Sequence, residues 1–319
     1  MPRPIHSFHN FVGQKKVVSL IEKHAAGSRA TGQAFPSTVI TGYSGTGKSS
    51  LARAIADYLQ VGFTKVMVTE ALRTPSLYVK LTTLKHGDIM LLDEAHRLAD
   101  DCQDLLLGAT GDQRAIQKMD FSKRRGDAAI DEVVSIANFT LIVASDRPGK
   151  LSNALLGRIP LRIRLGAYSD AEMRAICDAV CRDERIAASS HARTVLACAA
   201  RGIPREVANL IDLLKSFYPE QEPGQEITKG EVLAFLQEHG IDEHMLRPEE
   251  RQVLRTLLGQ DRPISARLLA RVIGVDLRYL ENHVEAPLLI SRLVEITPTG
   301  RRLTAKGREI AATLLEEEG

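Results

Sequence analysis

The segment Gly42–Ser49 constrains the fold of this chain more than any other part of it. Its sequence, GYSGTGKS, matches the phosphate-binding pattern GxxxxGK[ST]. A short β-branched run, Thr38–Thr41, precedes it, and Ser50–Leu59 has the pattern of a helix. Glycines let the backbone curl so that successive N–H groups face a phosphate, and the helix N-terminus adds partial positive charge. The sequence therefore predicts a strand, a nucleotide-binding loop and a helix, with ATP and Mg²⁺ as the ligands.

Individual residues of this loop have separate expected roles. Lys48 is expected to reach the β- and γ-phosphates, and the Ser49 hydroxyl to complete the coordination shell of Mg²⁺. The positions in and just after the loop that are expected to contact the nucleotide are Gly45, Thr46, Gly47, Lys48, Ser49 and Ser50.

An apolar run that ends in two carboxylates supplies the second half of such a site. Ile89–Leu92 reads as a buried strand, and Asp93 and Glu94 follow it directly. Asp93 is expected to hold Mg²⁺ through water, and Glu94 to polarise the water that attacks the γ-phosphate. The tetrad Asp93–His96 also spells the DEAH label of a helicase class. Those helicases carry two RecA-like domains, and this chain is too short for both.

Length, charge and cysteine content limit the class of protein. The 319 residues suit two or three domains, and a net charge of +2 means that a nucleic-acid site must be a local cluster. The four cysteines include no CxxC pair, which fits a reducing cytosol; Cys177 and Cys181 are expected to be core residues one helical turn apart. No apolar run is long enough to cross a membrane and the start lacks a signal-peptide core, so a cytoplasmic protein is expected.

Strands alternate with helices in the first half of the chain, and helices dominate after it. Thr140–Ala144 and Leu161–Leu165 read as further strands, which predicts an α/β fold with a parallel sheet, an ATPase domain over residues 1–168. Ser169 with Glu172, and Thr228 with Glu231, are capping-box signals. They predict a helical lid domain over residues 169–241.

The last region, residues 242–319, is predicted to be a winged-helix domain. Three helices are expected at Pro248–Leu258, Ser265–Ile273 and Leu277–Glu285. Leu293–Thr297 and the strand after the Pro298–Gly300 turn then form a β-hairpin. Three short helices followed by a hairpin are typical of a winged helix.

Cations cluster around this predicted hairpin, with Glu295 as the only acid between Arg292 and Arg308. Such a cluster favours contacts with a DNA backbone that are insensitive to sequence and sensitive to salt. Winged helices also bind proteins, and that alternative stays open here. The residues assigned to DNA binding are Arg292, Arg301, Arg302 and Lys306.

With these motifs in this order, the chain resembles the RuvB family, the bacterial Holliday-junction branch-migration ATPases of the AAA+ class. The resemblance covers most of the chain and is carried by Phe11–Gln14, Ala71–Asp88, Phe139–Arg147, Leu155–Arg158, Tyr168, Gly202–Arg205, Glu281–Leu289 and Thr297–Arg301. It implies an AAA+ core, a helical lid and a C-terminal winged helix. It also implies a homo-oligomer, expected to be a hexameric ring, that hydrolyses ATP to move double-stranded or branched DNA.

The resemblance assigns roles to residues outside the phosphate-binding loop. Val12 and Tyr168 would lie beside the adenine, and Arg158 would reach the γ-phosphate of a neighbouring subunit as an arginine finger. Pro204 and Arg205 match the sensor 2 motif, whose arginine contacts phosphate from the lid. Because Arg158 would serve a neighbour, the complete site requires an oligomer.

Two positions depart from the family pattern. Tyr43 stands where the loop usually has proline. Asp146 stands at the sensor 1 position, where a neutral Thr or Asn is expected, and a carboxylate there repels a γ-phosphate unless a cation intervenes. Either Ser145 takes over the role, or Asp146 turns aside and pairs with Arg147.

The segment Gln113–Glu132 departs from the family most. In the family it is a hairpin with an apolar tip that docks the partner RuvA. Here Gln113–Arg125 holds five positive residues and one negative. The segment is therefore expected to serve a RuvA-like partner, a different protein or DNA, or to be a solvated loop.

Two other functions fit the same motifs. The first is an AAA+ loader or regulator of the clamp-loader or transposition-regulator type, which acts on DNA and uses ATP as a timer. The second is a protein remodeller whose winged helix and charged hairpin bind protein. The cations of the predicted wing favour the functions that act on DNA.

Overall fold

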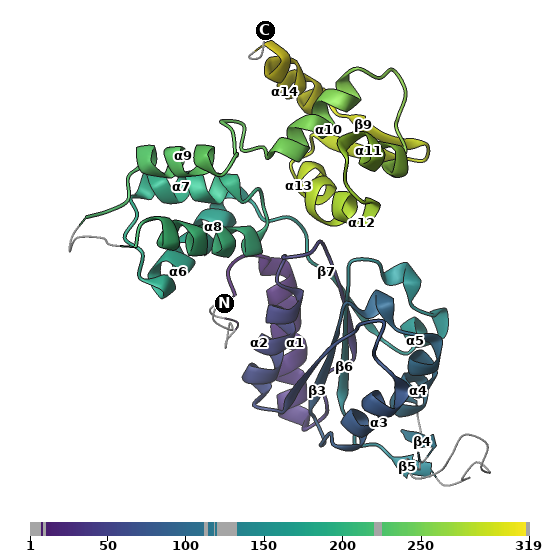
Figure 1. Ribbon diagram of the computed structural model, residues 1–319. Helices are drawn as coiled ribbons and strands as arrows, with labels where there is room; N and C mark the ends of the chain where they lie inside the picture. The colour runs from purple at the N-terminus through teal and green to yellow at the C-terminus, as the bar shows by residue number, and fades with distance from the viewer. Residues whose placement is uncertain are drawn as a thin grey trace. The chain divides into compact units, whose positions relative to one another are not determined.

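The computed structural model describes residues 8, 11–111, 114–117, 119, 133–219 and 225–316 (Figure 1). The chain divides into two compact units. Among the described residues, one unit contains those up to Tyr43 and from Gly47 to Gly166; the other contains the short segment Ser44–Thr46 and the residues from Ala167 onward. Each unit is described by itself below.

A five-stranded parallel sheet organises the first unit. Its strand order is β2-β3-β6-β1-β7, and every pair of neighbours runs parallel. The order places β1 in the interior of the sheet, directly before the phosphate-binding loop. The predicted parallel sheet is confirmed, with one strand, β2, that the sequence did not reveal. The strands are β1 (Thr38–Thr41), β2 (Phe63–Met67), β3 (Ile89–Asp93), β6 (Thr140–Ser145) and β7 (Leu161–Arg164).

Helices cover both faces of this sheet, because its central strands are apolar on both sides (Figure 1). Val39 belongs to one hydrophobic core and Ile40 to the other, as successive strand residues point to opposite faces. Helices α1 (Lys15–Thr31) and α2 (Lys48–Leu59) supply one core. The other is supplied by α3 (Thr74–Thr82), α4 (Asp100–Thr110) and α5 (Asn153–Gly157). Two 3₁₀ turns, η2 (Ala95–Arg97) and η3 (Pro148–Lys150), follow β3 and β6.

A small antiparallel hairpin leaves this unit between α4 and β6. Its strands are β4 (Ala115–Gln117) and β5 (Val133–Ser135), paired from Ala115 with Ser135 to Gln117 with Val133. The predicted partner-binding segment Gln113–Glu132 falls here, and most of it, including the expected tip, lies outside the described residues. Its role stays a prediction.

Four helices form a separate hydrophobic core in the second unit: α6 (Asp170–Glu184), α7 (Ser190–Ala199), α8 (Pro204–Phe217) and α9 (Lys229–Glu238). Both predicted capping boxes are present, Ser169 with Glu172 and Thr228 with Glu231. Cys177 and Cys181 are buried in this core, as expected of apolar residues one turn apart.

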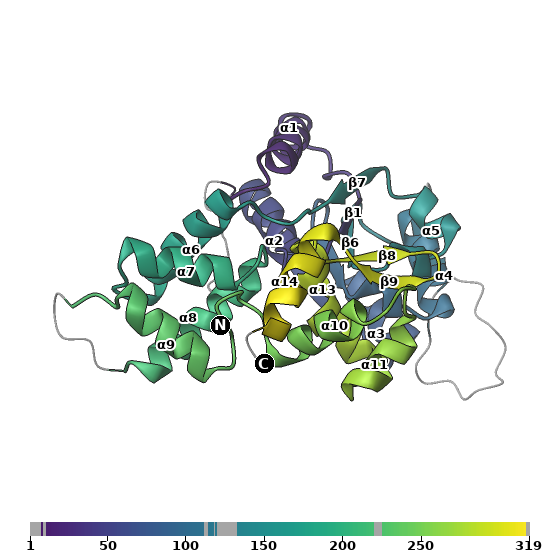
Figure 2. The ribbon, with the colours of Figure 1, turned by 90° about the horizontal axis from the view of Figure 1, so that it is seen from above.

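The winged helix has its own core in the same unit. Helices α10 (Pro248–Leu258) and α11 (Ala266–Ile273) match the first two predicted helices, and strands β8 (Val294–Thr297) and β9 (Gly300–Leu303) form the predicted hairpin. Figure 2 shows this hairpin beside α10 and the last helix, α14 (Ala305–Glu316), which the sequence did not reveal.

The third predicted helix is longer than expected. It consists of α12 (Leu277–Tyr279), a π-helical turn, η4 (Leu280–Val284), and α13 (Glu285–Ile290), which extends it past Glu285. Pro287 lies within this helix, although proline lacks the N–H that a helix interior needs. Here it stands in the first turn of α13, directly after the π turn, where that N–H is dispensable.

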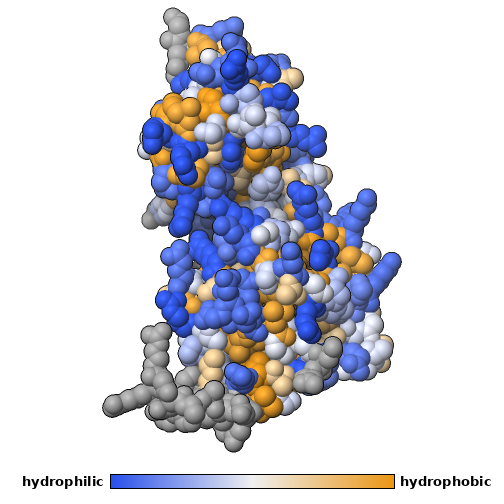
Figure 3. All heavy atoms as spheres, turned by 90° about the vertical axis from the view of Figure 1, so that its right-hand side faces the viewer, coloured by the Kyte–Doolittle hydropathy of each residue, from blue (hydrophilic) through white to orange (hydrophobic). Residues whose placement is uncertain are grey.

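Figure 3 shows how apolar residues are distributed on one face of the molecule. On the face drawn in Figure 3 they form separate patches among polar and charged residues. Among the residues that the structure describes, no helix combines the length and the apolar character needed to span a bilayer.

A buried ion pair joins the lid helices to the winged helix inside the second unit. The Arg201 guanidinium donates to the Glu250 carboxylate, and their side chains are only 10% and 2% exposed. Burial raises the pKa of Glu250 even though the charge and hydrogen bond of Arg201 act against it. A second pair, Arg247 with Glu206 at 2.7 Å, is more exposed.

We predict that Arg201→Ala lowers the free energy of unfolding by about 3–5 kcal/mol, because it strands a buried carboxylate. Urea unfolding followed by circular dichroism measures this. Arg247→Ala is the matched control, since its exposed pair is worth about 1 kcal/mol at most. Equal losses of unfolding free energy in the two variants would contradict the prediction that burial makes the Arg201–Glu250 pair the more costly one to break.

Candidate nucleotide-binding and DNA-binding sites

The phosphate-binding loop connects β1 to α2 as the sequence predicts. Gly45 and Gly47 have φ of 81° and 94°, in the left-handed region that glycine adopts without strain. A Cβ on Gly45 would lie 2.8 Å from Ile203 and 2.9 Å from Arg205, so glycine is also needed there for space. Thr46 is fully buried, and Ser50 lies half-buried in the first turn of α2.

Lys48 folds back over its own loop. Its Nζ donates to the carbonyl oxygens of Gly42 at 2.8 Å and of Tyr43 at 2.9 Å. The side chain is held where a bound phosphate would take over as the acceptor. Tyr43, which replaces the usual proline, thus contributes its backbone oxygen to this contact.

Ser49 on α2 is hydrogen-bonded to Asp93 at the end of β3. Ser49 Oγ donates to Asp93 Oδ2 at 2.7 Å, and Lys65 Nζ lies 2.8 Å from the same oxygen. Burial alone would raise the pKa of Asp93. Hydrogen bonds from Lys65 and Ser49, with the charges of Lys65 and Lys48, outweigh burial and hold that pKa below its usual value. The carboxylate therefore stays ionised, as a ligand of a divalent cation must be.

Lys65 was not predicted as a site residue. It lies on β2, whose Met67 pairs with Asp93, so a lysine two residues earlier can extend along the strand to the carboxylate. The pattern around Phe63–Met67 gave no strand signal, and without the strand nothing linked Lys65 to Asp93.

Glu94 directly follows β3, and the backbone changes direction at this residue. Its φ of 59° places a non-glycine residue in the left-handed region, and η2 begins directly after it. Unusual backbone conformations of this kind concentrate at functional sites. The side chain is 34% exposed, so water can reach the predicted general base.

Asp146, at the predicted sensor 1 position, lies beside an unexpected partner. Its Oδ1 is 3.0 Å from His96 Nδ1, whereas its Oδ2 is 3.8 Å from Arg147 Nε. The expected pairing of Asp146 with Arg147 is present, and the closer contact with His96 was not predicted. Ser145, the alternative sensor, is buried, and its Oγ accepts from the Arg147 backbone N–H at 3.0 Å.

Arg205 and Tyr168 contact the segment Ser44–Thr46 within their own unit. Arg205 Nη1 donates to Ser44 Oγ at 3.1 Å, and the Tyr168 hydroxyl donates to the Thr46 carbonyl at 3.0 Å. Pro204 and Arg205 open α8, where a proline at the first helical position is favoured. Both predicted residues thus contact the loop that would surround a nucleotide.

Arg158 and Val12 lie in the first unit. Arg158 follows α5, is exposed, and forms no ion pair with any other described residue. Such a cation is available to another molecule, as an arginine finger must be. Val12 is half-buried between Phe11 and the start of α1.

Comparison with known proteins decides the family. A family model described as "Holliday junction DNA helicase RuvB P-loop domain" matches residues 3–165, and one described as "RuvB C-terminal winged helix domain" matches residues 243–311. The chain belongs to the RuvB family. The family and the fold predicted from the sequence are both confirmed.

Curated and solved RuvB proteins resemble the chain over most of its length. The RuvB subunits of the Holliday junction branch migration complexes of Treponema denticola and Myxococcus xanthus are 31% and 30% identical to it. The matches cover 95% and 93% of this chain and 88% and 86% of those proteins. The Thermotoga maritima RuvB Holliday junction branch migration motor superposes with a TM-score of 0.81 at 26% identity, over 97% of this chain and 98% of that one.

The wing of this RuvB-family chain differs from a simple cluster of free cations. Arg301 donates to the Glu285 carboxylate of α13, with Nη2 3.1 Å from Oε2, and its side chain is only 16% exposed. This contact raises the pKa of Arg301. Arg302 is paired with Glu295 at 2.6 Å but is 55% exposed. The assignment of Arg301 to DNA binding stays a prediction, and its pairing with Glu285, sixteen residues away in the sequence, was not predicted.

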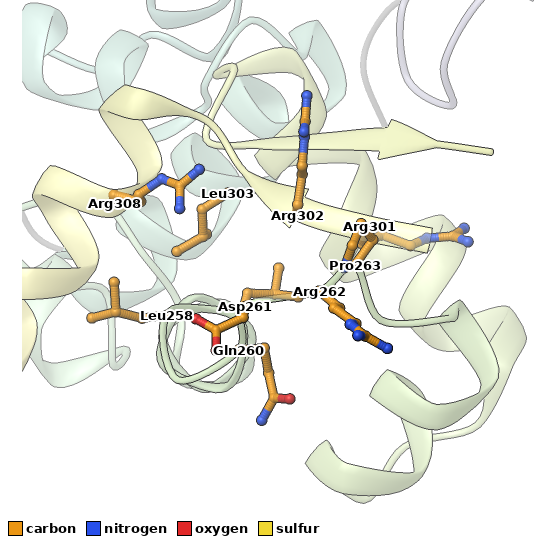
Figure 4. Close-up of a pocket in the computed structure, with 10 residues that line it drawn as sticks. Leu258, Gln260, Asp261, Arg262, Pro263, Arg301, Arg302, Leu303 and Arg308 are labelled. Atoms are coloured by element: carbon orange, nitrogen blue, oxygen red, sulfur yellow. The ribbon is translucent and has the colours of Figure 1, made fainter. Parts of the chain in front are cut away.

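The remaining predicted cations, Arg292 and Lys306, are exposed. A small pocket of about 100 Å³ adds Arg262, which was not predicted, beside Arg302 and Arg308. In Figure 4 the guanidinium groups of these arginines point in different directions. They suit several contacts along a DNA backbone better than one compact anion site.

We predict that Arg302→Ala with Lys306→Ala weakens duplex binding equally across DNA sequences. The slope of log affinity against log salt should fall by about 2, one for each lost phosphate contact. Fluorescence anisotropy at several salt concentrations measures both quantities. Arg182→Ala with Lys229→Ala, exposed on α6 and at the start of α9, is the matched control. An unchanged slope would remove these two residues from the DNA-binding surface.

Proposed function

We propose that this chain is one subunit of a ring-shaped ATPase that drives branch migration at Holliday junctions. One observation carries the proposal: a single RuvB-family chain joins a complete phosphate-binding loop and its acidic strand to a winged helix with exposed cations. The relatives named above are branch migration proteins, and the match to this chain covers nearly their whole length.

The residues around Asp93 suit Mg²⁺, which prefers hydroxyl, carboxylate and water oxygens. Ser49 Oγ and Asp93 Oδ2 already lie 2.7 Å apart. The Lys65 ammonium pairs with the same carboxylate, so this carboxylate already interacts with a cation. When bound, Mg²⁺ would neutralise charge that develops on the phosphates. Lys48 would exchange its carbonyl acceptors for phosphate oxygens, and Glu94 would orient and deprotonate the attacking water.

The proposed ring supplies what one subunit lacks. Arg158 is exposed and makes no ion pair with another described residue, so it can stabilise the transition state in the site of a neighbour. Arg205 and Pro204, which open the helix beside Ser44, would report the nucleotide state to the lid, and Tyr168 and Val12 would border the adenine. A hexamer is the proposed form of the ring.

The proposed partners are double-stranded or branched DNA, other copies of the chain, and a RuvA-like protein that docks on the hairpin at 113–132. Free cysteines, described at Cys102, Cys177, Cys181 and Cys198, fit the reducing cytoplasm, which is the proposed location. The division into an ATPase domain at 1–168, a lid at 169–241 and a winged helix at 242–319 is part of the same proposal.

The loader and the protein remodeller are not favoured, since the relatives reported above are branch migration proteins. A triplex-displacement assay separates the motor from the loader. A translocase that moves along duplex DNA releases a bound third strand while it hydrolyses ATP, but not with a non-hydrolysable analogue. ATP turnover that accompanies assembly on DNA without release of the third strand would favour the loader.

A further inference from the structure

A histidine that the proposed mechanism does not use lies between two carboxylates of the ATPase site. His96 Nδ1 is 3.0 Å from Asp146 Oδ1 and 3.7 Å from Glu94 Oε2. One ligand atom of each of the three residues lies within 4.8 Å of those of the other two. The His96 side chain is 13% exposed, and its Nδ1 is buried without a well-aligned hydrogen bond to any described residue.

The chemistry of this arrangement assigns the hydrogen on the imidazole ring. Ionised carboxylates are acceptors only, and a neutral imidazole nitrogen is either a donor or an acceptor. A lone pair on Nδ1 would face two acceptor oxygens and be repelled by both. Nδ1 therefore carries hydrogen, and the nearer of the two acceptor oxygens is Asp146 Oδ1.

We infer that His96 is a positioning residue for ATP hydrolysis, whose Nδ1–H lies beside the Asp146 carboxylate and reduces its repulsion of Glu94. This inference rests on the proposed ATPase activity. Without the donor, two carboxylate oxygens less than 5 Å apart in a partly buried site repel each other. Glu94 then loses the orientation that a general base needs toward its water.

Arg147 does not replace the histidine. Its Nε is 3.8 Å from the other oxygen of Asp146, and its side chain is 41% exposed, so solvent weakens its effect. The His96–Asp146 pair also explains how a carboxylate is tolerated at the sensor 1 position. The group there is an aspartate with an imidazole nitrogen 3.0 Å from its Oδ1 rather than a bare anion.

The test compares kcat and KM for ATP in four variants. His96→Ala should lower kcat by about 10²-fold, the order of loss that a small misplacement of a catalytic group causes, and leave KM nearly unchanged. His96→Asn should retain most of kcat, because its amide N–H takes nearly the place of Nδ1. His96→Ala with Asp146→Asn should recover kcat relative to His96→Ala, because the repelling carboxylate is gone. Asp146→Asn alone is measured as the reference for this recovery.

The recovery separates positioning from a general structural role, because a second change that only loosened the fold would not restore turnover. His191→Ala, an exposed histidine on α7, is the matched control, and thermal unfolding of every variant is measured alongside. Wild-type kcat in His96→Ala, or a double variant no faster than His96→Ala, would overturn the inference and leave the ATPase proposal intact. Absence of DNA-stimulated hydrolysis in the wild-type protein would instead overturn the proposed function.

Discussion

Replacing Arg158 by alanine is expected to lower kcat for ATP hydrolysis by about 10³–10⁵-fold, because an arginine finger stabilises charge in the transition state. Arg158 is exposed, follows α5, and has no ion-pair partner among the other described residues, so little local structure depends on it. ATP binding and thermal stability should remain close to those of the wild type. Steady-state turnover and nucleotide titration measure the two properties separately.

Mixed assemblies distinguish an arginine that acts on its own subunit from one that acts on a neighbour. Arg158→Ala subunits have an intact loop, so they should regain turnover when subunits that carry Lys48→Ala but keep Arg158 are mixed in. Arg174→Ala, exposed on α6, is the matched control and should hydrolyse ATP normally. If mixing restores no activity, the arginine does not act between subunits, and the argument for a ring loses its main support.

Glu94→Gln is the second change with a large expected effect. Loss of the general base should lower kcat by about 10²–10⁴-fold, while the loop, Lys48 and Ser49 continue to bind ATP. Because the nucleotide is trapped, the ATP-bound oligomer should accumulate. Light scattering with ATP measures assembly, and phosphate release measures turnover.

Glu309→Gln on α14, an exposed glutamate outside the site, is the control for this substitution. Near-normal turnover in Glu94→Gln would assign the base to another residue. Since Glu94 also contacts His96, the two variants should not add independently: His96→Ala should have little further effect once Glu94 is gone.

Local patterns predicted the parts of the molecule that depend on neighbouring residues. Three predicted features depend only on residues that are close in the sequence, and all three are present. They are the glycines of the loop, the apolar run before Asp93 and the capping box at Ser169. The winged helix followed from the order of its elements in the same way. The resemblance to RuvB then located Arg158, Tyr168 and Arg205, whose roles no local pattern could assign.

Contacts between distant segments could not be predicted. Strand β2 is short and only Val66 in it is buried, so its sequence lacks a clear period, and the Lys65–Asp93 contact went unseen with it. Arg301 looked like a free cation because Glu285 lies sixteen residues away on another element. The His96–Asp146 contact was not predicted, because it depends on the parallel pairing of β3 with β6, which only the sheet as a whole determines.

The most direct test of the account is the dissociation of a synthetic four-way DNA junction, measured with and without a RuvA protein. With ATP, the wild-type protein should convert the junction to duplex products, and Glu94→Gln should not. Products without RuvA would mark an autonomous motor; products only with RuvA would mark a motor that depends on its partner. No products in either condition, from protein that binds the junction and hydrolyses ATP, would contradict the proposal that this chain drives branch migration.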